Sequence, residues 1–158
     1  MGKKKDVPIV AKDETSGALF DAGHLALKAG QIENAKGLFL KGLAKDPTNR
    51  LAKTGLADAY LRLQLPADAQ ALLEPVYEED KTDQKVLILL GQSYQSHKES
   101  AAKGLALFES LYAENDRDEL VLNQLAGLYR VTKAYDKSVA MCKRILERNP
   151  DSIEALKT

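Results

Sequence analysis

The chain has 158 residues, 44% of them hydrophobic and 29% charged, which is enough apolar material for one folded unit of ordinary size. Its 23 Lys and Arg residues balance 23 Asp and Glu residues, so no general positive charge draws the chain to nucleic acid. No apolar run approaches the roughly 20 residues that a membrane-spanning helix needs. We therefore expect a cytoplasmic protein with no nucleic-acid partner and no transmembrane segment.

Residues 1–14 are charged and lack an apolar period, so we expect a mobile N-terminal segment. Residues 15–158 are rich in Ala and Leu, and their apolar residues recur with the 3.6-residue period of a helix. Gly, Pro and polar residues interrupt this period at 28–30, 46–49, 65–66, 96–100 and 149–151. The chain is therefore predicted to be all-α, with helices separated by short turns.

A group of three residues recurs along these helices. Tyrosines at 60, 94 and 129 are 34 and 35 residues apart, and each follows a leucine by four positions and a small residue by three. The leucine and small residue are Leu56-Ala57, Leu90-Gly91 and Leu125-Ala126. The small residues predict close approach of the paired helix. A second pattern of small, large, small residue and proline follows the first, for example at Ala35, Phe39, Gly42 and Pro47.

This 34-residue pattern resembles the tetratricopeptide repeat. The resemblance covers about 16–152, with repeats at about 16–49, 50–83, 84–118 and 119–152, and it implies helix-turn-helix units stacked into a right-handed α-solenoid. One departure stands out, because Lys53 occupies a place that holds leucine in the other three repeats. A further helix is expected to begin at 152–158, where the chain stops, so we expect either a fragment of a longer protein or self-association through this end.

The resemblance also implies that peptides or partner helices bind a concave face lined by the first helix of each repeat. The expected lining is Phe20, His24, Leu27, Lys28, Asp58, Leu61, Arg62, Lys85, Ile88, Gln92, Gln95, Asn123 and Arg130. Four of these residues are cations and one is an acid, which favours a partner segment with apolar anchors and some acidic residues. Phe20 and His24 occupy the places where some relatives hold a carboxylate clamp, so chaperone C-terminal tails are disfavoured.

Little in the sequence points to catalysis. Cys142 is the only cysteine and occupies the large apolar place shared with Phe39, so it is predicted to lie in the core. His24 and His97 match no metal motif, and no glycine-rich phosphate loop is present. We therefore expect no enzyme activity, no metal and no cofactor.

Three functions fit these observations. The first is a scaffold that holds a partner segment and helps assemble a larger complex. The second is a chaperone of tetratricopeptide type for a secreted or aggregation-prone client, and the third is a regulatory or targeting domain of a larger protein. Co-purification with such a client favours the second function, and the full reading frame distinguishes the third.

Overall fold

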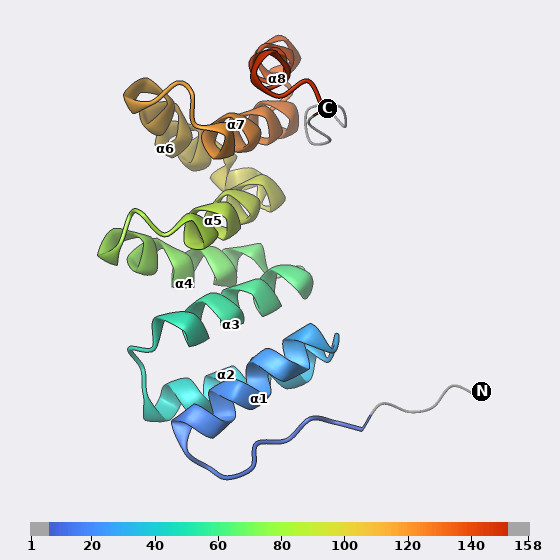
Figure 1. The fold of residues 1–158 in the computed structure, drawn as a ribbon, viewed down its shortest axis with the longest axis vertical. Helices are drawn as coiled ribbons and strands as arrows, with labels where there is room; N and C mark the ends of the chain where they lie inside the picture. Colours follow the sequence, from blue (N-terminus) through green and yellow to red (C-terminus); the bar gives the residue numbers. More distant parts are fainter. Residues whose placement is uncertain (1–6, 152–158) are drawn as a thin grey trace, which may run out of the picture. The chain divides into compact units, whose positions relative to one another are not determined.

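The computed structural model describes residues 7–151, and all regular secondary structure in this range is helical (Figure 1). The prediction of an all-α chain of helix-turn-helix repeats is thus confirmed. The expected further helix at 152–158 lies outside the described residues. The elements are α1 Ser16–Lys28, α2 Ile32–Lys45, α3 Arg50–Arg62, α4 Pro66–Glu79, α5 Gln84–Ser96, the 3-10 helix η1 Lys98–Ser100, α6 Ala101–Glu114, α7 Glu119–Val131 and α8 Tyr135–Arg148.

The chain divides into two compact units, which we call unit 1 (Met1–Val86) and unit 2 (Leu87–Thr158). In both units a side chain caps the first helix of a repeat. Thr15 accepts a hydrogen bond from the Ala18 N–H at 3.2 Å, and Asn49 accepts one from the Ala52 N–H at 2.9 Å. Asp118 likewise caps α7. These caps satisfy backbone donors at the helix start, which fixes where each of these repeats begins.

The core of unit 1 is built around Phe39 of α2, whose side chain is fully buried. Its ring lies against two backbone positions without side chains, Gly23 of α1 and Gly55 of α3. A Cβ atom at either glycine would lie 2.8 Å or 2.6 Å from the ring, so only glycine admits the aromatic side chain here. The small residue of the repeat pattern thus makes room for the large residue of α2.

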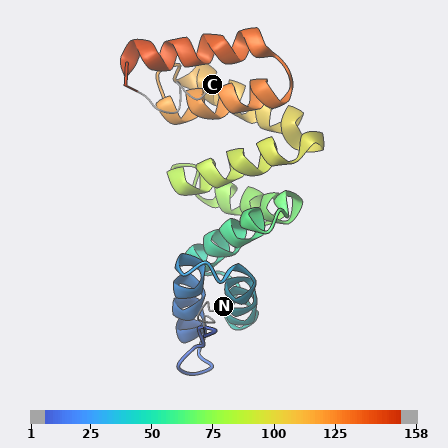
Figure 2. The same cartoon turned by 90° about the vertical axis from the view of Figure 1, so that its right-hand side faces the viewer.

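The core of unit 2 contains Leu122, Ala126, Cys142 and Ile145, contributed by the antiparallel helices α7 and α8 (Figure 2). The prediction that Cys142 is a core residue is confirmed, because the thiol is buried. Close helix approach in this unit also occurs at Gly104 of α6, where a Cβ atom would lie 2.6 Å from the Tyr94 Cβ.

The turns inside three repeats share a left-handed backbone conformation. The φ angles are 82° at Gly30, 62° at Gln64 and 65° at Lys133. In each turn the next N–H donates to a carbonyl five residues earlier, as from Leu65 to Tyr60 at 2.8 Å. Only the first of these turns uses glycine, the residue that adopts positive φ without a steric penalty.

Residues 7–14, which were expected to be mobile, make specific contacts with unit 1. Ile9 packs against the hydrophobic core, and its backbone is hydrogen-bonded to side chains of Gln31 and Asn34. Glu14 forms an ion pair with Lys41 at 3.3 Å. The segment lacks an apolar period because it is held mainly through its backbone and a single packed side chain, Ile9.

Arg50 at the start of α3 holds the end of α4. Its guanidinium donates to Asp83 Oδ2 at 3.0 Å, to the Val76 carbonyl at 2.8 Å and to the Asp80 carbonyl at 3.2 Å. These carbonyls lie where the helix ladder runs out of donors, so Arg50 satisfies acceptors that α4 itself leaves open.

Replacing Arg50 with Ala is therefore expected to lower the free energy of unfolding by about 1–2 kcal/mol, since the side chain is partly exposed. Lys is expected to restore less than half of the loss, because an ammonium group has no planar fork to reach three acceptors. Urea unfolding followed by circular dichroism measures both effects. Full rescue by Lys would show that charge alone matters.

Candidate partner-binding surfaces

The first helices of the two repeats in unit 1, α1 and α3, contact each other, and each exposes polar side chains. We call His24, Lys28, Asp58 and Arg62 the α1–α3 face. His24, Lys28 and Arg62 are exposed or partly exposed, and Asp58 is half-buried. Arg62 donates to Asp58 at 3.1 Å, one helical turn away, so the single acid of this face is already neutralised within α3. The net charge of the face is therefore positive.

The pKa of His24 is consistent with the positive charge of this face. Partial burial lowers the pKa of His24 below its ordinary value, and the positive charge of Lys85 lowers it further, against the opposing effect of Asp21. The ring meets Phe39 edge-on, with centroids 4.8 Å apart. A neutral imidazole is thus favoured at pH 7, and the positive charge of the region comes from Lys28 and Lys85.

Two of the residues expected to line the face are instead part of the core. Phe20 is 7% exposed and Leu27 is 9% exposed, and both belong to the hydrophobic cluster of unit 1. The Phe20 ring fills the space beside Gly42 of α2, where a Cβ atom would lie 2.5 Å from its Cε1 atom. The prediction that the Phe20 side chain is open to a partner is therefore wrong. Replacing Phe20 with Ala is expected to destabilise the fold. Leu61, half-buried, is the aliphatic side chain that remains accessible.

In unit 2, the expected lining residues differ in accessibility. Gln92 and Arg130 are exposed, Ile88 is 37% exposed, and Asn123 is half-buried. Gln95 is engaged between helices, because its Nε2 donates to Gln124 Oε1 at 2.7 Å. This amide pair joins α5 to α7 and fills the space beside Gly127.

The neighbour of Gly91 also differs from the expectation. The repeat pattern predicts that the paired helix, α6, lies against this glycine. In the structure, a Cβ atom at Gly91 would overlap the side-chain amide of Gln124 on α7. The small residue in this repeat thus makes room for the next repeat's first helix. The close approach of the paired helix occurs at Gly104 instead.

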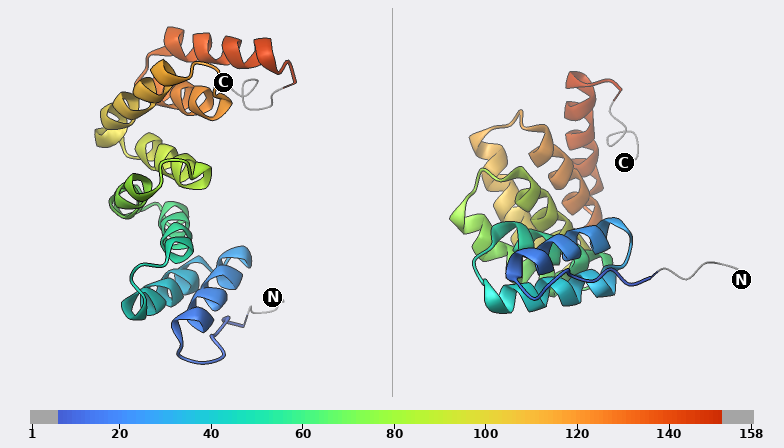
Figure 3. Two further views of the ribbon diagram at one scale, coloured as in Figure 1. Left: turned by 60° about the vertical axis from the view of Figure 1, so that its left-hand side comes forward. Right: turned by 60° about the horizontal axis from the view of Figure 1, so that its bottom comes forward.

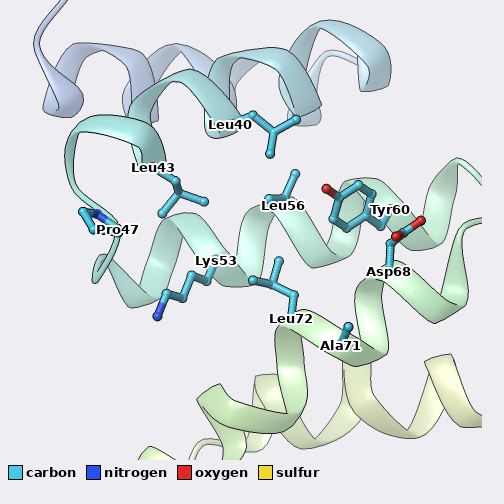
Figure 4. Close-up of a pocket in the computed structure, with 9 residues that line it drawn as sticks. All are labelled: Leu40, Leu43, Pro47, Lys53, Leu56, Tyr60, Asp68, Ala71 and Leu72. Atoms are coloured by element: carbon cyan, nitrogen blue, oxygen red, sulfur yellow. The ribbon is translucent and has the colours of Figure 1, made fainter.

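A hollow of about 400 Å³ lies between α2, α3 and α4 of unit 1 (Figure 4). Leu40 and Leu43 reach into it from α2, Leu72 reaches in from α4, and Lys53 lies on α3. Lys53 stands where Leu19 and Leu122 are buried in other repeats. Its Nζ atom turns toward Glu79, 4.0 Å away, and this leaves the apolar space unfilled. The hollow can take an apolar side chain, and the departure at Lys53 was its only sequence signal.

The described residues offer little for catalysis. In 7–151, no three His, Cys, Asp or Glu side chains gather as metal ligands would. Among the same residues, no helix is long and apolar enough to cross a membrane. Burial and a hydrogen bond from its hydroxyl to Glu109 at 2.6 Å raise the pKa of Tyr129. A phenol with a raised pKa stays protonated and holds α7 to α6, so its role is structural.

Comparison with known proteins agrees with the helical architecture. Residues 26–93 match the family model described as tetratricopeptide repeat. The chain also resembles YrrB, described as a TPR protein with an unusual peptide-binding site, with a TM-score of 0.78 and 18% identity over 92% of this chain and 75% of that one.

Two further solved structures share the fold. MamA from Desulfovibrio magneticus RS-1 has a TM-score of 0.74 and 20% identity, covering 89% of this chain and 80% of that one. A thermophilic TPR protein from Thermus thermophilus has a TM-score of 0.67 and 18% identity, covering 86% and 75%. Such folds generally serve as non-catalytic scaffolds for protein interactions. The family match and these neighbours lead to one conclusion: residues 26–93 match the tetratricopeptide repeat, and the described residues share the fold of tetratricopeptide repeat proteins, with eight α-helices that are consistent with about four repeats.

Proposed function

We propose that this protein is a non-catalytic scaffold that binds a segment of a partner protein on the α1–α3 face and helps assemble a complex. The observation that carries this proposal is the exposure of Lys28 beside His24 on α1, while Asp58 is paired with Arg62 within α3. The exposed cations Lys28 and Lys85 outnumber the nearby exposed acid Asp21, and a surface with net positive charge attracts acidic residues. The peptide-binding site named for the similar protein YrrB supports a peptide as the ligand class.

The chemistry of the partner follows from the same residues. Acidic side chains would lie near Lys28 and Lys85, and an aliphatic side chain would contact Leu61. Phe20 and Leu27 contribute no open anchor, so we propose that charge provides a larger share of the affinity than the sequence suggested. In unit 2, we propose Ile88, Gln92, Asn123 and Arg130 as partner contacts of that unit by itself.

The test compares two doubly charge-reversed chains. Lys28→Glu with Lys85→Glu alters the proposed surface, whereas Lys98→Glu with Lys143→Glu changes the net charge equally at exposed positions outside it. Proteins retained from a lysate by the wild-type chain are identified by mass spectrometry and then measured individually. We expect the first variant to weaken binding about tenfold, since each exposed pair contributes about 0.2–1 kcal/mol and reversal adds repulsion.

The control variant is expected to bind like the wild type, and added salt is expected to weaken wild-type binding. A partner that binds both variants equally at low salt would place the interaction outside the α1–α3 face.

A further inference from the structure

The backbone of residues 7–9 is held by two side-chain amides of unit 1. Gln31 Oε1 accepts from the Ile9 N–H at 2.8 Å, and Gln31 Nε2 donates to the Val7 carbonyl at 2.9 Å. Asn34 Nδ2 donates to the Ile9 carbonyl at 2.8 Å and to Gln31 Oε1 at 3.0 Å. We call Gln31 and Asn34 the amide clamp. Figure 3 shows the bound segment running alongside the α1–α2 hairpin before the chain turns back into α1.

The amide clamp contacts the main chain of its occupant rather than its side chains. Both Gln31 contacts and the Asn34 contact go to backbone N–H or carbonyl groups. Pro8 lies between the contacted residues and has no N–H that would need a partner, and it favours extended backbone at Val7. Among these residues only Ile9 packs on the core, whereas Val7 is 81% exposed and Val10 is 77% exposed. Any extended segment with one suitable aliphatic side chain meets these requirements.

We propose that the amide clamp is a binding site for an extended aliphatic segment of a partner protein, and that residues 7–10 are its occupant within the same chain. Recognition through the main chain does not require the partner to share the surrounding sequence. Two exposed valines add little affinity, so the occupant is held largely by its tether, which raises its local concentration. This site is separate from the α1–α3 face, and its failure would leave the proposal for that face standing.

The test uses the full chain with its own segment released. Ile9→Asp removes the packed side chain, and the probe is an acetylated fluorescent peptide with the sequence of residues 6–11, Asp-Val-Pro-Ile-Val-Ala. Fluorescence polarisation is expected to show at least about tenfold tighter binding to the Ile9→Asp chain than to the wild type. Adding Gln31→Ala is expected to abolish the gain. A peptide N-methylated at its isoleucine lacks the N–H that Gln31 accepts and is also expected to lose binding.

Equal binding of the peptide to the wild-type and Ile9→Asp chains, or equal binding of the two peptides, would overturn the proposal. Hydrogen exchange of the wild-type chain gives a measurement that does not depend on the folding of a variant. The Ile9 amide is expected to exchange more slowly than in the Gln31→Ala chain, and unprotected exchange in the wild type would also overturn it. Wild-type dimers that disappear with Ile9→Asp would instead identify a second copy as the occupant and reject a partner protein.

Discussion

Replacing Phe39 with Ala is expected to lower the free energy of unfolding of unit 1 by about 3–5 kcal/mol, the range for truncating a fully buried aromatic side chain. The upper part of this range applies because the ring lies against the backbone of two glycines. Gly23 and Gly55 have no side chains that could move into the vacated space, so a cavity remains between α1, α2 and α3.

Urea unfolding followed by circular dichroism measures this loss. Leu25→Ala in α1 is the matched control, because that side chain is 58% exposed and its truncation is expected to cost less than about 0.5 kcal/mol. A loss below about 1 kcal/mol for Phe39→Ala would mean that the ring does not join the three helices.

Two glycines of α2 are expected to respond in opposite directions to the same substitution. Gly42→Ala would place a Cβ atom 2.5 Å from Phe20 Cε1 and 3.3 Å from Leu19 Cβ, so the core must shift at a cost of about 1–3 kcal/mol. Gly37 has nothing within 4 Å of the added atom. Gly37→Ala is expected to stabilise the helix by about 0.5–1 kcal/mol, because alanine loses less backbone entropy.

Thermal unfolding of the two variants checks this prediction directly. Since both substitutions add one methyl group to the same helix, helix propensity cancels in the comparison and the remaining difference reports the Phe20 contact. Similar melting temperatures for the two variants would contradict the burial of Phe20 against α2.

The helices and their repeat pattern could be predicted because each packed stripe recurs at a fixed spacing. Leu56 and Leu125 lie at equivalent places and are both buried. Cys142 was placed correctly by the same register. Phe20 was not, because periodicity identifies the centre of a buried stripe but not its width, which depends on the neighbouring helix. The feature that indicates the burial of Phe20 is Gly42, which lies opposite its ring.

The amide clamp and the hollow could not be read from periodicity at all. Gln31 and Asn34 contact backbone atoms of residues far away in the sequence, and backbone atoms leave no residue pattern. The hollow arises at Lys53, because the charged end of this side chain does not fill the apolar space. It can therefore be recognised only when the helix packing is known. The expected site residues depend on the same packing, and those on the α1–α3 face remain proposals.

The left-handed turns affect how far the conformation of each repeat depends on the rest of the chain. For residues other than glycine, this conformation costs about 1–2 kcal/mol. Gln64 and Lys133 nevertheless adopt φ angles of 62° and 65°, close to the 82° of Gly30. In the second and fourth repeats, the helices must therefore impose the turn against its local preference. The first hairpin needs no such compensation, so its conformation depends least on the rest of the chain.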